Sequence, residues 1–167
     1  MPFTPYHLGP GLFFGLLLFR YLDFPAFLIA NIVVDVEPFL VLAFGLQYPL
    51  HGFFHSLIGA SLVALVLAVA LPRTSSYYEP LLSKLRLSQR LSRGETFLAS
   101  LLGVYSHVLM DSLLYSDIRP FFPLDANPFL RGQSIAGAVY SFCVASFVLG
   151  TTLYVSKRIA DNLRRRK

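Results

Sequence analysis

The amino-acid sequence predicts an all-α fold, a polytopic bundle of about five membrane-spanning helices that forms a single domain over residues 1–167. Of these residues 55% are hydrophobic and 14% are charged, whereas soluble domains carry about 25% charged residues. Several apolar stretches reach the length of about 20 residues that a helix needs to cross a bilayer core. Basic residues gather beside these stretches, as they do at the cytoplasmic ends of membrane helices. The net charge of +5 therefore indicates membrane flanks and not nucleic-acid binding.

The predicted spans follow one another along the chain, and the first is short. It covers residues 9–22, about 21 Å of helix at 1.5 Å per residue. Such a helix crosses only where the bilayer thins, or where the helix begins below one surface. The remaining spans are long enough to cross upright and cover residues 24–46, 53–71, 95–115 and 134–155.

The segment 73–93, between the third and fourth spans, has a different pattern. Leucines such as Leu81 and Leu85 are interleaved with basic residues such as Lys84 and Arg86. This pattern predicts an amphipathic helix that lies along the inner membrane surface as a structural anchor. Docking of a partner is the alternative role for the same helix.

The basic residues also orient the bundle, with the N-terminus outside and the C-terminus inside. They are concentrated between Arg73 and Arg93 and in a basic tail, 157–167, so both segments are expected in the cytoplasm. The opposite side receives only Arg119 and Arg131. We expect a multi-pass protein of the cell membrane, and the absence of a signal-peptide pattern fits a prokaryotic plasma membrane.

Seven ionisable side chains fall within or beside the apolar spans, where ionisable groups are costly and usually have a partner or a function. They are His7, Asp35, Glu37, His51, His55, His107 and Asp111. His51 and His55 are four residues apart, as are His107 and Asp111, so each pair shares one helix face and can present two ligands to one metal ion. At 1.5 Å per residue the seven groups can meet in one layer in the outer half of the membrane. We predict that this layer binds metal.

The second span contains a predicted irregularity beside its two acids. Pro38 disfavours α geometry at Glu37 and removes a backbone donor. A kink or break here lets Asp35 and Glu37 reach one site, although residues two apart diverge on a regular helix. Asn31 lies one turn before Asp35 and is predicted to supply a supporting hydrogen bond.

These polar residues are grouped in short motifs. The motifs read Thr4-Pro5-Tyr6-His7, Val34-Asp35-Val36-Glu37, His51-Gly52-Phe53-Phe54-His55-Ser56 and Ser106-His107-Val108-Leu109-Met110-Asp111. In this order they resemble the membrane-bound metal-dependent hydrolase family (YdjM-like), over positions 4 to about 130. Val34, Glu37 and Gly52 stand where that family typically has proline, aspartate and arginine. The order is also similar, more weakly, to that of zinc-dependent phospholipases C and related nucleases, which implies phosphoester chemistry by analogy alone.

The sequence thus predicts a metal-dependent hydrolase, with zinc as the first choice of metal and manganese or iron as alternatives. The predicted ligands are His7, Asp35, His51, His55, His107 and Asp111. Asp35 and Glu37 are the predicted catalytic groups, Glu37 as a further ligand or as the general base. Because a catalytic zinc typically has three protein ligands, the set fits one or two ions. Arg119 and Arg131 are predicted to hold an anionic head group of a lipid or lipid-linked phosphoester, unless they are ordinary solvated loop residues.

Two other functions stay open at this stage. A metal- or proton-handling transport protein is one, because intramembrane histidine and aspartate chains carry ions. Five spans without an inverted repeat argue against it, although an oligomer would relieve that objection. A non-catalytic, metal-stabilised membrane scaffold is the other. Membrane lipids are the expected partners in each case.

Overall fold

The computed structural model describes residues 5–89 and 92–164, and every regular element in these ranges is helical. The elements in chain order are the 3₁₀ turn η1 (Pro5–His7), α1 (Leu8–Leu17), α2 (Phe24–Val33), α3 (Val36–Phe44), the 3₁₀ turn η2 (Phe53–His55), α4 (Leu57–Leu85), α5 (Arg93–Ser112), the 3₁₀ turn η3 (Gly132–Ile135) and α6 (Ala136–Arg164). The predicted all-α fold is confirmed. Thr4 of the first motif and positions 165–167 of the basic tail lie outside the described residues.

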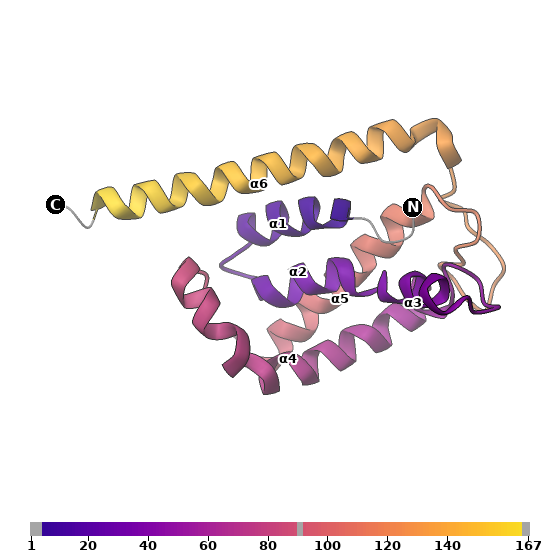
Figure 1. Ribbon diagram of the computed structural model, residues 1–167, viewed down its shortest axis with the longest axis horizontal. Helices are drawn as coiled ribbons and strands as arrows, with labels where there is room; N and C mark the ends of the chain where they lie inside the picture. Colours follow the sequence, from indigo (N-terminus) through magenta and orange to yellow (C-terminus); the bar gives the residue numbers. More distant parts are fainter. Residues whose placement is uncertain (1–4, 90–91, 165–167) are drawn as a thin grey trace.

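The helices pack side by side in the order α6, α1, α2, α5 and α4 (Figure 1). α5 lies between α2 and α4, and the short α1 lies between α2 and α6. The end of α2 and the end of α5 come together on the side of the molecule where α3 and η2 also lie. Glu37, His55, His107 and Asp111 are carried by these elements, and Asp35 lies between α2 and α3.

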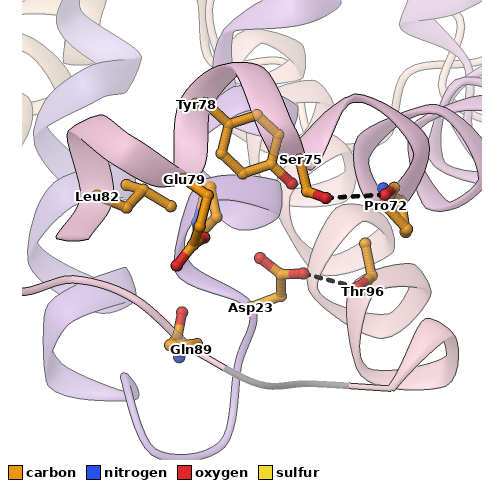
Figure 2. A pocket seen from close by; sticks show the side chains of 9 residues that line it. Asp23, Pro72, Ser75, Tyr78, Glu79, Leu82, Gln89 and Thr96 are labelled. Atoms are coloured by element: carbon orange, nitrogen blue, oxygen red, sulfur yellow. Dashed lines mark hydrogen bonds between the residues drawn. The ribbon is translucent and has the colours of Figure 1, made fainter.

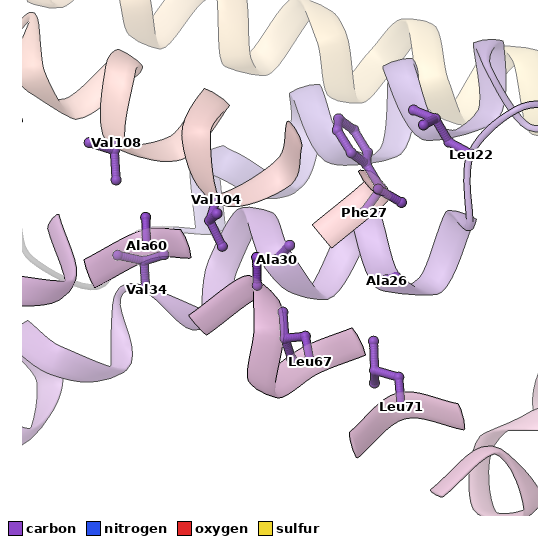
Figure 3. Close-up of a cluster of buried hydrophobic side chains, with 12 residues drawn as sticks. Leu22, Ala26, Phe27, Ala30, Val34, Ala60, Leu67, Leu71, Val104 and Val108 are labelled. Atoms are coloured by element: carbon purple, nitrogen blue, oxygen red, sulfur yellow. The ribbon is translucent and has the colours of Figure 1, made fainter. Parts of the chain in front are cut away.

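Small side chains allow the helices of the core to approach closely (Figure 3). Ala30 on α2, Ala60 on α4, and Val104 and Val108 on α5 are fully buried in one apolar cluster. In lipid, association of helices depends on close packing of this kind, because the hydrocarbon is as apolar as the side chains.

Gly103 on α5 packs tightly against α2. A Cβ atom at this position would lie 2.5 Å from the Cβ of Ala30 and 2.8 Å from the carbonyl oxygen of Phe27. Gly150 has the same role between α6 and α1, where a Cβ would lie 2.9 Å from the backbone nitrogen of Phe13. Glycine at these two positions sets the spacing of the layers.

Within residues 5–89 and 92–164, three helical stretches are long and apolar enough to cross a membrane, namely Phe24–Phe44, Leu57–Leu85 and Gly132–Arg164. Large apolar side chains on α4 and α6, such as Val66 and Val148, are exposed, as expected for a surface that faces lipid. With ten residues α1 rises only about 15 Å, half of a hydrocarbon core. The apolar helical bundle is confirmed, whereas the count of five spans and the orientation stay predictions.

The predicted span 24–46 is broken at Val34 and Asp35. A break in this region is what Pro38 indicated. α2 ends at Val33 and α3 begins at Val36, with α3 leaving at a steep angle (Figure 1). Pro38 falls in the first turn of α3, where its missing N–H is tolerated. The break therefore places Asp35 at a junction and not on a straight helix.

The segment predicted as a separate surface helix, 73–93, differs in the structure. α4 continues through Pro72 to Leu85 and changes direction in its second half (Figure 1). Proline bends a helix and removes one of its hydrogen bonds, but side chains donate to the carbonyl oxygens near this bend. The donor–acceptor pairs are Arg73–Val69, Thr74–Ala70, Ser75–Pro72 and Tyr78–Leu71. No new helix start is therefore needed, and positions 90–91 lie outside the described residues.

The close packing of α2 and α5 can be tested by a substitution that adds one methyl group. Gly103→Ala should lower the stability of the protein by about 1–3 kcal/mol, because the added Cβ overpacks a tight interface. Gly137→Ala on α6 is the matched control, since a Cβ there meets no atom within 4 Å. Thermal unfolding in detergent measures both variants. Equal melting temperatures for the two variants would contradict the packing described here.

Candidate metal centre

Four buried side chains from three parts of the chain converge near the α2–α3 break. Asp35 lies at the break, His55 ends η2, and His107 and Asp111 lie one turn apart on α5. Each offers one ligand atom, and these atoms all lie within 4.8 Å of one another. The group can therefore hold a metal ion.

His107 is held by the backbone of α2. Its Nδ1 lies 2.8 Å from the carbonyl oxygen of Asn31, which can only accept, so Nδ1 carries the hydrogen and Nε2 carries the lone pair. Nε2 lies 3.5 Å from Asp35 and 3.4 Å from Asp111, but it is buried without a hydrogen bond. The support predicted from Asn31 comes from its main chain, while its side chain accepts from Ser106.

His55 is held by Glu37 in a similar way. Its Nδ1 lies 2.9 Å from a carboxylate oxygen of Glu37, and its Nε2 is buried with no partner. The same carboxylate accepts hydrogen bonds of 3.1 Å from the backbone nitrogens of Gly52 and Phe54. Glu37 thus contacts a histidine and the η2 turn, and is not part of the group of four.

His51 precedes η2 and lies on a loop, so the expected helical face shared with His55 is replaced by a turn. The two rings are nevertheless 4.8 Å apart at their centroids. His51 Nδ1 lies 3.0 Å from both carboxylate oxygens of Asp117, its ring stacks on Tyr115, and its Nε2 is buried without a partner. Sequence reasoning missed Asp117, because a lone acid in a polar loop carries no spacing signal.

His7 borders the group from the opposite side. Its Nε2 lies 3.1 Å from a carboxylate oxygen of Asp111, and its ring centroid is 3.9 Å from that of His107. The residue closes η1, which delivers it to the buried layer ahead of α1. All six predicted ligands are therefore neighbours, four within one group and two at its edges.

Three histidines share one arrangement that fits a metal ion. In His51, His55 and His107 the Nδ1 atom contacts a carboxylate or carbonyl oxygen, and the Nε2 atom is buried and makes no hydrogen bond. A buried polar atom without a partner costs about 1–3 kcal/mol. Metal-binding histidines almost always use one ring nitrogen for such an outer contact and the other for the metal. The donor set present here suits a divalent cation.

A cavity of about 460 Å³ lies beside His51, on the side of the loop that follows α5. His51 and Asp117 line it together with aromatic rings, among them Phe53 and Phe122, whose ring centroids are 5.7 Å apart. Arg119 also lines this cavity, and its Nε is 3.0 Å from Asp125 in an exposed ion pair.

The second predicted head-group residue is placed differently. Arg131 is exposed and donates to the carbonyl oxygens of Pro128 and Leu130. Its side chain thus contacts its own loop, outside the residues that line the cavity.

A larger cavity of about 550 Å³ opens at the other end of α5 (Figure 2). Asp23 and Glu79 lie there, but Asp23 caps α2 by accepting from the backbone nitrogen of Ala26 and also accepts from Thr96. The side chain of Gln89 accepts a hydrogen bond from the backbone nitrogen of Phe24 and donates one to the carbonyl oxygen of Leu22. It thereby ties the segment after α4 to the turn between α1 and α2. These contacts stabilise helix ends, and the group of four candidate ligands lies toward the opposite end of α5.

The comparisons with known proteins agree with the membrane fold. Neither a curated protein nor a solved structure matches the chain. The model of the YdjM inner membrane protein family matches residues 2–163, which is almost the whole sequence. The chain therefore belongs to the YdjM inner membrane protein family and is a membrane protein.

Proposed function

We propose that this chain is a membrane-embedded, metal-dependent hydrolase that acts on a lipid or lipid-linked phosphoester. One observation carries the proposal: His55 and His107 each keep a buried Nε2 atom that makes no hydrogen bond, and the ligand atoms of these two histidines and of Asp35 and Asp111 all lie within 4.8 Å of one another. Imidazole and carboxylate ligands suit zinc, with manganese or iron as alternatives. His7 and His51 border this group and would allow for a second ion.

A divalent cation bound here supplies Lewis acidity, which polarises a phosphoester and lowers the pKa of water. The residues of the chain hold and orient the site. The Asn31 carbonyl and the Glu37 carboxylate fix the rings of His107 and His55. Both histidines are fully buried, and the neighbouring His51 lines the cavity.

Glu37 is best explained as a positioning residue. Its carboxylate already accepts from two backbone nitrogens and contacts His55 Nδ1, so little of it is left for a metal ion or a water molecule. Outer contacts of this kind fix the tautomer and ring orientation of a metal-binding histidine. This role replaces the ligand or general-base role that the sequence predicts.

The cavity beside His51 supports an amphiphilic substrate. Its aromatic lining suits a lipid portion, and Arg119 suits a phosphate. The pair of Arg119 with Asp125 is exposed on both sides, and exposed ion pairs contribute little. Arg119 can therefore exchange this partner for a substrate phosphate at low cost.

Metal binding tests the centre. His55→Gln and His107→Gln should each lower the zinc bound per detergent-purified protein at least tenfold, because each removes a ligand nitrogen. Thr96→Val is the matched control, a buried polar residue at the other end of α5, and it should keep the metal of the parent. Elemental analysis measures the content. Parent-like zinc in both histidine variants would exclude the site.

Glu37→Gln tests the positioning role. We expect metal affinity to fall about 10–100-fold, the usual cost of losing an outer contact, with full occupancy and turnover restored by excess zinc. The measurements are zinc titration and hydrolysis of a short-chain phospholipid in mixed micelles. Turnover that stays lost at saturating zinc would instead assign Glu37 to the reaction.

Arg119→Gln tests the substrate. It should raise the KM for an anionic lipid phosphoester several-fold, without a change in metal content, since the residue lines the cavity outside the metal group. Arg131→Gln is the control with the same change of charge on the same loop.

If the parent protein carries metal ions across vesicle membranes and hydrolyses no lipid phosphoester, transport would be favoured over the proposed activity.

A further inference from the structure

A small cavity of about 170 Å³ lies between three elements and shares no residue with the candidate metal centre. The end of α1, the residues just after α4 and the last turns of α6 line it. Three of its lining residues are basic, Arg86, Lys157 and Arg158, and Asp161 is the acid among them. The proposed hydrolase activity makes no use of this cavity.

The guanidinium groups in the cavity lack partners. The Nη1 atoms of Arg86 and Arg158 are both buried and make no hydrogen bond. No carboxylate of the described residues, Asp161 included, lies within 4.0 Å of either side chain. Burying a charged donor without a partner is unfavourable. Two such donors in one cavity require an acceptor with negative charge.

Hydrogen bonds between distant parts of the chain hold the walls of this cavity together. Tyr154 on α6 donates to the carbonyl oxygen of Leu85, which ties the end of α4 to α6. Arg86 then turns into the left-handed region with a φ of 57°. Lys157 donates from Nζ to the carbonyl of Leu16 at the end of α1. These bonds join all three elements around the two arginines.

The depth and the size of the cavity limit the ligand. Arg158 lies about 33 Å along α6 from Ala136 at 1.5 Å per residue, close to the thickness of about 30 Å of a hydrocarbon core. The cavity therefore falls at the level of lipid head groups if α6 starts at the opposite surface. Leu16 and Phe19 add an apolar wall. Pockets for drug-sized ligands enclose about 300–1,000 Å³, so this one admits a phosphate group and not a nucleotide.

We propose that this cavity binds the phosphate of an anionic phospholipid, with Arg86 and Arg158 as donors to its oxygens and Lys157 beside them. Guanidinium forks match phosphate oxygens, and charge-assisted hydrogen bonds of this kind are strong. Basic pockets between membrane helices are a recognised setting for lipid head groups. The exposed apolar surface of α6, next to the cavity, accommodates the acyl chains.

Lipid binding by the full-length protein in dodecylmaltoside tests this site. The probes are phosphatidylglycerol, phosphatidylcholine and inorganic phosphate, and the readouts are lipid retention in native mass spectrometry and the rise in melting temperature, because a ligand that binds only the folded state stabilises it. Phosphatidylglycerol should be retained and should raise the melting temperature of the parent protein. Phosphatidylcholine, which has no net charge, should do so much less.

The double variant R86Q/R158Q should bind phosphatidylglycerol about tenfold more weakly. R73Q/R164Q is the matched control, because it removes the same charge from exposed positions outside the cavity, and it should bind like the parent. R86K/R158K keeps the charge without the fork and should bind with intermediate strength. Zinc content should not change in any of these variants, so this site and the metal centre are tested separately.

Equal losses of binding in R86Q/R158Q and R73Q/R164Q, or no loss in either, would overturn the proposal. If inorganic phosphate stabilises the parent as much as phosphatidylglycerol does, the lipid assignment is wrong and free phosphate is the ligand. Helix content measured by circular dichroism identifies a variant that fails to fold. If R86Q/R158Q fails to fold, R86K/R158K replaces it, and phosphatidylglycerol binding by R86K/R158K that equals binding by the parent would overturn the proposal.

Discussion

The structure depends on one constraint: imidazole and carboxylate groups inside an apolar bundle must find partners within the protein. His51, His55 and His107 meet this need at Nδ1, whereas His7 contacts Asp111 through Nε2. The acceptors are the Asn31 carbonyl for His107, Glu37 for His55 and Asp117 for His51. In these three rings Nε2 is buried and makes no hydrogen bond. Satisfying one nitrogen of each ring therefore produces a set of preoriented donors for a metal ion.

The interface between α2 and α5 both stabilises the bundle and positions His107. Gly103 and Ala30 let α2 and α5 approach closely, and one turn further along α5 His107 reaches the backbone of α2. The break after Val33 then turns Asp35 toward the same layer. A bulkier residue in this interface would move the ring away from its acceptor, so the helix spacing controls both the stability of the bundle and the geometry of the site.

The two ends of the bundle carry unpartnered polar atoms of opposite character. At the candidate metal centre these atoms are lone-pair nitrogens beside carboxylates, which can hold a cation. In the cavity formed by α1, α4 and α6 they are the guanidinium donors of Arg86 and Arg158, which require an anion. An amphiphilic protein in a bilayer meets both kinds of ligand, metal ions from water and phosphates from lipid.

The sequence by itself determined the helical membrane fold and the residues of the central layer, because apolar length, histidine spacing and the proline beside Asp35 are local signals. It did not determine the contacts between distant residues. Asp117 pairs with His51 across 66 positions, and Glu37 reaches the η2 turn. α4 passes through Pro72, and side chains bond the carbonyls near its bend. Arg86 and Arg158 meet only because three elements end together. These contacts depend on how loops return and how helices dock, and no local pattern in the chain encodes that geometry.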